Sequence, residues 1–457
     1  AGWLHGEMTR AALEPQGARP GGLGARAQAL AMAAAAAAPY LLAAHYDRGE
    51  ERFAEAVERE FFGEPLTGPA AVPVLMVTDT YDELNGVAGT MRRLAAHAAA
   101  RPGCGITVVT CGAGGSEPGR RDLEPVARLP VPAYGDRGWT LGVPSVIDVL
   151  ALAQETGARV VHAATPGPAG LAAMLVARAL RLPFATTHHT ELARYVLDLT
   201  GDRLAGDLAD RAVRWFHGRA DRVYVPTRAT GEGLAAGGVD PGRIVRFGRG
   251  VDLALFGPGR RSRRMRRRLG GDGVIVLYVG RLSREKGLPL LAEAFRRTRA
   301  HRPELRLAVV GEGPGRAELE AALRGTPHRL LGALHGRELA EAYASADLFC
   351  LPSATETFGQ VTLEAAASGL PAVVLDRGAA AEQVAHGETG LVCPAGDPDA
   401  LAARLALLCD DPALRARMGA AAAPSWGEVF DGLAAGYADL AGPPGRARAV
   451  AVAGTAA

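Results

Sequence analysis

The sequence predicts an α/β protein built from two doubly wound parallel sheets in tandem. Short apolar segments of β-forming residues recur along the chain with helical patterns between them, which is typical of parallel βαβ units. These segments are apolar almost throughout, which indicates sheets covered on both faces. They fall into two series, one starting near residue 72 and the other at Val274. A chain of 457 residues is also too long for one ordinary core.

The expected strands follow in chain order. In the first series they are residues 72–78, 105–110, 158–165, 183–189 and 221–226, and in the second 274–280, 305–311, 347–353 and 371–375. Each segment ends near small or polar residues. Because ligands of such sheets bind outside the carboxyl ends of the strands, we expect two domains that face a cleft holding the substrate site.

The domain boundaries follow from changes in composition. We expect a helical N-terminal extension of unknown role (residues 1–70), two Rossmann-like domains (71–248 and 249–424), a closing helix (425–441) and a flexible tail (442–457). The run 27–44 is dominated by alanine and broken by Pro39, which argues against a membrane-spanning helix. The first residue is not Met, which is consistent with a piece of a longer protein.

Composition narrows the function classes. The net charge of +2 gives no reason to expect a nucleic-acid partner. Five cysteines without a CxxC pair fit a reducing compartment, so we expect a cytoplasmic protein. Seven arginines fall within residues 260–268. A solvated linker helix is the favoured interpretation of that run, over a nucleic-acid patch or an anionic lipid site.

Lys286 is the only lysine and Asn85 the only asparagine of the chain. Positive charge is otherwise supplied by arginine, which we attribute to the codon bias of a GC-rich genome. Under such a bias, a single surviving lysine or asparagine indicates that the position needs it. Chance survival is the alternative.

Two segments of the second series carry phosphate-binding chemistry. After the strand ending at Gly280, Arg281 and Lys286 present two cations that suit a diphosphate, although both could be ordinary surface charges. Residues 311–315 (GEGPG) resemble a dinucleotide fingerprint, but no acidic residue follows in 326–334. We therefore interpret Gly313 as lining a nucleotide pocket.

Residues 345–374 contain the largest number of candidate site residues. In this segment a strand leads through a polar loop to a helix that we expect to start near Gly359. Glu356 lies in that loop and Glu364 in the second turn of the helix. Free backbone N–H groups from Phe358 to Val361 could hold phosphate oxygens or sugar hydroxyls. The alternative makes Glu356 a partner of the helix dipole and Glu364 a surface charge.

The first domain offers two further loops at strand ends. In Asn85-Gly86 the glycine lets the backbone approach a phosphate, although an ordinary turn is the alternative. His188 and His189 follow the strand 183–189 and suit polar contact with a substrate, although such residues are often structural. No HExxH or comparable ligand set accompanies them, so no metal site is expected.

Together these segments resemble the family 4 retaining glycosyltransferases, which have the GT-B fold. The resemblance spans about residues 72–441. It is carried by 280–287 (GRLSREKG), the E-x7-E spacing of Glu356 and Glu364, 249–252 (RGVD), 85–90 (NGVAGT) and 425–437, which resembles the family's closing helix that crosses back onto the first domain.

The resemblance implies an acceptor-side first domain and a second domain that binds a nucleotide-diphosphate sugar. It implies that Arg281 and Lys286 hold the diphosphate and that Glu364 holds the ribose. Catalytic roles are implied for His189, Arg281, Lys286 and Glu356, donor contacts for Gly86, Arg281, Lys286, Gly313, Glu356, Phe358, Gly359, Gln360, Val361 and Glu364, and acceptor-side positions for Asn85 and His188. The family transfers with retention and needs no cofactor or metal ion.

The donor is expected to be a GDP- or UDP-hexose and the acceptor a lipid, a glycan or a small molecule, since RGVD and NGV resemble mannosyltransferases and glycolipid synthases. A lipid acceptor would suit peripheral docking at the inner membrane face through Arg92, Arg93 or nearby arginines. Gln360 and His188 depart from the family pattern, and we expect them to tune the choice of sugar or acceptor. The alternatives are a nucleotide-sugar epimerase of the same fold, an NAD-dependent oxidoreductase, a phosphorylase and a non-catalytic binding module.

Overall fold

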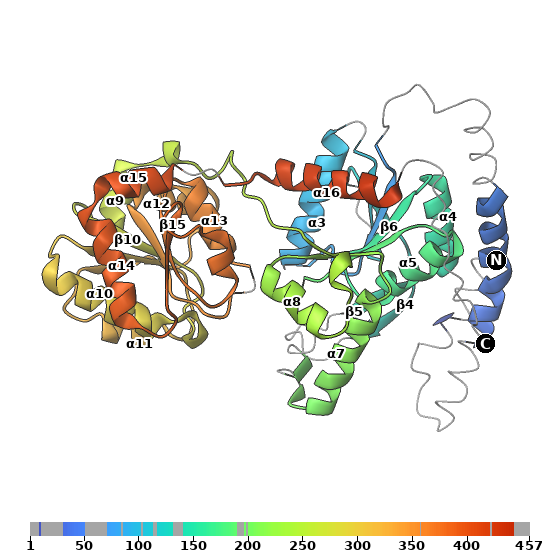
Figure 1. Ribbon diagram of the computed structural model, residues 1–457, viewed down its shortest axis with the longest axis horizontal. Coiled ribbons are helices and arrows are strands. Elements are labelled where there is room, and N and C mark those ends of the chain that lie inside the picture. Colours follow the sequence, from blue (N-terminus) through green and yellow to red (C-terminus); the bar gives the residue numbers. More distant parts are fainter. Residues whose placement is uncertain are drawn as a thin grey trace, which may run out of the picture. The chain divides into compact units, whose positions relative to one another are not determined.

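The computed structural model describes residues 9–10, 31–50, 71–83, 86–101, 104–112, 117–130, 140–189, 196–197, 200–356, 358–420 and 423–442. The chain divides into two compact units. The first comprises Ala1–Val225, Gly231–Arg246 and Phe430–Ala457, and the second Pro226–Thr230 and Phe247–Val429. Figure 1 shows a strand-and-helix core in each of them.

The first unit is built on a seven-stranded sheet with the order β3-β2-β1-β6-β7-β8-β9. All of its strand pairs are parallel. The strands are β1 (Val74–Thr78), β2 (Ile106–Thr110), β3 (Arg120–Asp122), β6 (Val160–Ala163), β7 (Phe184–Thr187), β8 (Arg222–Val225) and β9 (Ile244–Arg246). β4 (Pro125–Pro130) and β5 (Thr140–Pro144) form a separate antiparallel pair.

Helices cover both faces of this sheet. They are α3 (Gly86–Ala100), α4 (Val146–Glu155), α5 (Pro168–Ala179), α7 (Arg203–His217) and α16 (Trp426–Ala441), with α8 (Arg228–Ala236) after β8. Side chains alternate along β6, so Val161 and Ala163 pack with α5 in one core cluster. His162 points to the opposite face and hydrogen-bonds Tyr437 of α16. The prediction that the C-terminal helix returns to the first domain is thereby confirmed.

The second unit holds a six-stranded parallel sheet with the order β12-β11-β10-β13-β14-β15. Its strands are β10 (Ile275–Val279), β11 (Arg306–Val310), β12 (His328–Leu330), β13 (Leu348–Leu351), β14 (Ala372–Leu375) and β15 (Gly390–Cys393). Its helices are α9 (Arg263–Leu269), α10 (Leu288–His301), α11 (Arg316–Ala322), α12 (Gly336–Ser345), α13 (Gln360–Ala367), α14 (Pro398–Asp410) and α15 (Pro412–Gly419). The predicted α/β class with two doubly wound sheets is confirmed.

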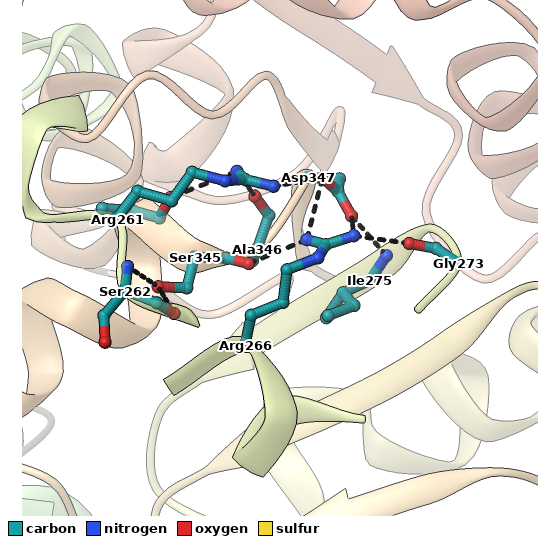
Figure 2. A network of polar contacts seen from close by, with 9 residues as sticks. Arg261, Ser262, Arg266, Gly273, Ile275, Ser345, Ala346 and Asp347 are labelled. Carbon is teal, nitrogen blue, oxygen red and sulfur yellow. Dashed lines mark hydrogen bonds and ion pairs between the residues drawn. The ribbon is translucent and has the colours of Figure 1, made fainter. Parts of the chain in front are cut away.

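The arginine-rich segment around α9 belongs to the second unit. Arg266 forms an ion pair with Asp347, directly before β13, at 3.0 Å and donates to the carbonyls of Gly273 and Ser345 (Figure 2). Arg261 reaches the same carboxylate at 3.4 Å, and Asp347 accepts from the Ile275 N–H at 2.8 Å. The expectation of a solvated helix is therefore wrong for Arg266, whose guanidinium clamps α9 to the sheet.

Within the N-terminal extension the structure describes residues 9–10 and 31–50, which are helical. Ala33, Ala37 and Ala44 form the buried stripe of this helix, and His45 Nδ1 lies 2.9 Å from the carbonyl oxygen of Ala179. Residues 51–70 of the expected N-terminal extension and the expected tail after residue 442 lie outside the described residues. Among the residues that are described, no helix combines the length and the apolar character needed to cross a membrane.

Candidate active site

The loop after β10 places the expected diphosphate-binding cations. It contains a short 3-10 helix, η4 (Arg284–Lys286), which ends at Gly287 with φ +71°. A Cβ at Gly287 would lie 1.9 Å from the Pro352 carbonyl oxygen, so only glycine permits the loops after β10 and β13 to approach this closely. Because β10 and β13 are neighbours in the sheet, their carboxyl ends form one site.

Lys286 and Glu356 meet in that site. Lys286 Nζ donates to Glu356 Oε1 at 2.7 Å, and their side chains are 22% and 14% exposed. The Glu356 carbonyl also accepts from the Ala379 N–H at 3.0 Å, which fixes the backbone at the carboxylate. The structure thus joins the chain's only lysine to the carboxylate predicted to hold the donor sugar, 70 positions away in sequence.

Arg281 stands at the start of the same loop. Its carbonyl accepts from the buried Tyr278 hydroxyl at 3.0 Å, while its side chain is exposed. Its guanidinium takes part in no ion pair within the described part of the chain. Burial and the nearby Glu356 carboxylate raise the pKa of Tyr278, so this hydroxyl stays protonated as a donor. Arg281 is therefore anchored by its backbone and keeps its charge toward solvent.

The loop after β13 leads directly into α13. The helix begins at Gln360, as expected, and its N-cap residue Gly359 has φ +84° and no side-chain capping hydrogen bond. The first turn therefore presents backbone N–H groups without a side-chain acceptor, the arrangement that binds anions. Phe358 is buried beneath the Arg249 guanidinium, which lies 5.3 Å from its ring centroid. Gln360 Nε2 donates to the Gly250 carbonyl at 3.0 Å, so its side chain supports the RGVD segment.

Glu364 extends from the second turn of α13. Its Oε2 accepts a hydrogen bond of 3.1 Å from the hydroxyl of Tyr343, on α12. Tyr343 is fully buried, and burial together with the Glu364 carboxylate raises its pKa well above the usual value. The phenol therefore remains a donor and orients the carboxylate. Sequence reasoning did not identify Tyr343, because only the packing of α12 against α13 reveals the contact.

A pocket of about 580 Å³ lies at the ends of β11 and β12. It is lined by Glu312, Gly313, Arg316, Leu330, Leu331 and Gly332. Gly313 is required here, because a Cβ would lie 2.3 Å from the carbonyl oxygen of Leu282 in the β10 loop. The pocket combines an apolar wall with a carboxylate and a guanidinium, a lining suited to a heterocyclic base. Residues 331–334, directly after β12, include no carboxylate, which leaves the dinucleotide fingerprint without its acidic partner.

The remaining candidates lie in the first unit. Gly86 is the exposed first residue of α3, whereas Asn85 lies outside the described residues. Arg92 donates to the carbonyls of Tyr81 at 2.7 Å and Glu83 at 3.1 Å. Its guanidinium therefore supports the loop after β1, a task different from the membrane docking expected of it.

His188 and His189 directly follow β7. The His188 N–H donates to the Tyr224 carbonyl at 2.8 Å, and its Nδ1 lies 3.2 Å from Nε2 of His217 on α7. His217 Nδ1 in turn lies 2.9 Å from the Thr186 hydroxyl. Burial, with small contributions from His188 and His162, lowers the pKa of His217 to about 3, so that ring is neutral and holds His188 as a hydrogen-bond partner. His217 thus supports His188, one of the two candidate histidines after β7. Sequence reasoning did not identify His217.

Comparisons with known proteins agree with these features. The family model described as Glycosyl transferases group 1 matches residues 260–424, and the model for Glycosyltransferase Family 4 matches residues 84–255. A GDP-mannose-dependent alpha-mannosyltransferase of Mycobacterium tuberculosis is 38% identical over 57% of this chain and 68% of its own length. One from Corynebacterium glutamicum is 31% identical over 70% of this chain and 76% of its own length.

A sulfoquinovosyl transferase of Arabidopsis thaliana is 35% identical over 58% of this chain, which spans about half, 52%, of that relative. Among solved structures, Anabaena HepE in complex with UDP and glucose gives a TM-score of 0.58 at 19% identity, covering 80% of this chain and 99% of that one. Sucrose-phosphate synthase from Thermosynechococcus elongatus gives 0.57 at 21% identity with the same coverage. At these identities the likeness concerns the fold alone, and it confirms the expected GT-B class.

Every relative named above is a glycosyltransferase or a synthase of the same fold, and none supports the epimerase or oxidoreductase alternatives. The mannosyltransferases share more than 30% identity with this chain across more than two thirds of their length. The chain therefore belongs to glycosyltransferase family 4.

Proposed function

We propose that the chain is a retaining hexosyltransferase that takes its sugar from a nucleotide-diphosphate donor bound in the second unit. The observation that carries this proposal is the Lys286–Glu356 pair, at 2.7 Å, at the carboxyl ends of the adjacent strands β10 and β13. The first turn of α13, whose backbone N–H groups have no side-chain cap, follows Glu356 closely in the chain. One site thus offers a cation for a phosphate, a carboxylate for hydroxyls and backbone donors for oxygens.

Each part of the donor has a matching group in this unit. Arg281 and Lys286 would bind the diphosphate, and Glu364, oriented by Tyr343, would accept both hydroxyls of the ribose. The pocket at Gly313 would hold the base between its leucines and its carboxylate. Glu356, with the amides of Phe358 and Gly359, would hold hydroxyls of the sugar.

The chemistry follows from the charge that develops during transfer. As the glycosidic bond breaks, negative charge grows on the departing diphosphate. Fixed cations in that place stabilise the transition state more than the ground state, by about 3–4 kcal/mol for one well-placed donor. No separate nucleophilic carboxylate is required for attack from the same face, and we propose that no metal ion takes part.

The residues of the first unit would serve the acceptor side. His189, with His188 held by His217, would contact the reacting sugar or the acceptor hydroxyl, and Gly86 would border the donor. The acceptor class, a lipid, a glycan or a small molecule, stays a prediction, as does the cytoplasmic location.

Among hexose donors we propose GDP-mannose as the first to test, because the GDP-mannose-dependent relatives match over more of their own length than the sulfoquinovosyl transferase does. The test is a calorimetric binding screen of GDP- and UDP-sugars combined with release of free nucleotide on incubation. Tight binding of one sugar nucleotide with slow nucleotide release supports the proposal. Recovery of an epimerised donor without nucleotide release would support the epimerase, and binding of NAD alone would support the oxidoreductase.

A further inference from the structure

The pocket at the ends of β11 and β12 contains two opposite charges. Its lining includes the carboxylate of Glu312 and the guanidinium of Arg316, together with the half-buried side chains of Leu330 and Leu331. Its volume of about 580 Å³ lies within the range of small-molecule sites. The base of the proposed donor would lie here, so the polar groups of the lining decide which base fits.

The backbone around Glu312 is fixed to the neighbouring loop. The Leu282 N–H donates to the Glu312 carbonyl at 2.8 Å, and the Gly315 N–H donates to the Leu282 carbonyl at the same distance. Gly311 donates to the Gly332 carbonyl at 2.8 Å, which ties the end of β11 to the end of β12. A Cβ at Gly332 would lie 3.4 Å from Glu312 Oε1, so the carboxylate extends over the end of β12. Its side chain therefore reaches the pocket from a fixed backbone.

Neither charge has a partner among the residues that the structure describes. Arg316 is the first residue of α11 and stands four positions after Glu312. Although both line one pocket, no ion pair joins them, and within the described ranges neither side chain forms a hydrogen bond. A carboxylate and a guanidinium that share a pocket without pairing are available to a ligand that carries both donors and acceptors.

Guanine matches these two groups on adjacent edges. Its N1–H and its 2-amino group lie side by side and both donate, so one carboxylate can accept from the two together. Its O6 and N7 both accept, and a guanidinium binds this pair of atoms in the same bidentate manner. Leu330 and Leu331 would provide apolar contact for the ring.

The other bases fit the same groups less well. Uracil has one N–H group between two carbonyl oxygens, so a carboxylate that accepts from this N–H also faces a carbonyl. Adenine has an unprotonated N1 beside its amino group, and cytosine has the same arrangement at N3. A carboxylate that faces such a nitrogen loses hydrogen bonds to water and gains only one in return.

We propose that Glu312 and Arg316 select guanine as the base of the donor. Glu312 would accept from N1–H and the 2-amino group, and Arg316 would donate to O6 and N7. Both are specificity-determining residues and take no part in breaking the glycosidic bond. This inference rests on the proposed transferase function, because it concerns the base of that same donor. It is independent of the similarity to GDP-mannose-dependent enzymes, since it follows from the lining of the pocket.

Calorimetric titration of the full chain with GDP, inosine diphosphate (IDP), UDP and ADP tests the assignment. These nucleotides share the ribose and the diphosphate, so differences in affinity report the base. We expect GDP to bind at least about tenfold more tightly than UDP and ADP. IDP lacks only the 2-amino group and should bind at least about fivefold more weakly than GDP, because one hydrogen bond to the Glu312 carboxylate is lost.

Substitutions separate the two residues. Glu312→Gln keeps the size of the side chain but replaces one acceptor with a donor, so GDP should lose about tenfold in affinity and its advantage over IDP should vanish. UDP can pair with a carboxamide and should bind at least as tightly as before, which also shows that the variant is folded. Arg316→Gln should weaken GDP and IDP by the same factor, because both carry O6 and N7.

The matched controls are Glu318→Gln and Arg324→Gln, at exposed residues outside the lining of the pocket, which should bind as the unaltered chain does. The assignment is overturned if UDP or ADP binds as tightly as GDP, or if Glu312→Gln retains the preference for GDP over IDP. Unchanged GDP affinity in Arg316→Gln would remove Arg316 from it. In each of these cases a nucleotide still binds and the transferase proposal stands. If none of the four nucleotides binds, the transferase proposal fails and the base assignment fails with it.

Discussion

Lys286 donates a 2.7 Å hydrogen bond to Glu356, and this half-buried pair joins the loops that follow β10 and β13. A lysine beside a carboxylate is held in place before any phosphate arrives. Binding of a diphosphate would give the ammonium a second anionic partner, and the carboxylate would remain available to sugar hydroxyls. The pair therefore combines preorganisation with charge for a leaving group.

The approach of these two loops depends on Gly287. In Gly287→Ala the new Cβ would meet the Pro352 carbonyl oxygen at 1.9 Å in addition to the strain of φ +71°. We expect the free energy of unfolding to fall by about 3 kcal/mol or more, since strain alone costs about 1–2 kcal/mol. Urea denaturation measures it. Gly325→Ala is the matched control, because Gly325 has φ +77° but open space around its Cβ position, and an equal loss in both variants would remove the steric argument.

Tyr343 is expected to act on donor affinity through Glu364. Tyr343→Phe removes the donor of the 3.1 Å hydrogen bond that orients the carboxylate. Because hydrogen bonds to charged groups contribute about 1.5–3 kcal/mol, we expect the donor KM to rise about tenfold or more, with kcat changed far less. Steady-state kinetics with the identified sugar nucleotide provides the measurement. An unchanged KM would show that Glu364 does not bind the donor.

The buried contact between His162 and Tyr437 secures the C-terminal helix to the first unit. His162 Nδ1 lies 2.5 Å from the Tyr437 hydroxyl, and its Nε2 lies 2.7 Å from the Thr187 hydroxyl. Tyr437→Phe leaves one ring nitrogen buried without its partner, so we expect a loss of about 1–3 kcal/mol in unfolding free energy. Tyr46→Phe, at a side chain 72% exposed, should change stability by less than about 0.5 kcal/mol. Similar values for the two variants would contradict this account.

The same histidine predicts a dependence of stability on pH. Burial lowers the pKa of His162 to about 3, against about 6.5 in an unfolded chain. The unfolded state therefore binds the extra proton, so the contribution is fully present above about pH 6.5 and is lost as the pH falls from there toward 3. Between about pH 6 and pH 4.5 unfolding free energy should fall more steeply in the unaltered chain than in His162→Gln, by up to about 1.4 kcal/mol per pH unit. Parallel slopes would mean that His162 does not titrate on unfolding.

Much of the fold was predictable because the central strands are long apolar runs. Each expected strand contains an observed one, from β1 at Val74–Thr78 to β14 at Ala372–Leu375. Six observed strands were not predicted, namely β3, β4, β5, β9, β12 and β15. Among them, β3 (Arg120–Asp122) and β12 (His328–Leu330) lie at sheet edges and are polar, because an edge strand needs little apolar surface to pair.

The residues of the candidate site also fall into those that the sequence predicted and those that it did not. Lys286 and Glu356 were predicted from residue type and from their place after strands, and the structure brings them together. Tyr343 and His217 were not predicted, because an aromatic or a histidine within a helix gives no sign of which side chain it will contact.

The most direct test of the transferase account is the rate at which Lys286→Ala releases nucleotide from a saturating sugar nucleotide in a single turnover. Loss of one preorganised cation should lower this rate at least about a hundredfold, while unfolding free energy stays within about 1 kcal/mol of the unaltered chain. Arg296→Ala serves as control, because Arg296 is exposed and the Ala322 carbonyl is its one hydrogen-bond partner among the described residues. A rate within about threefold of the unaltered chain in folded Lys286→Ala would contradict the claim that Lys286 stabilises the departing diphosphate.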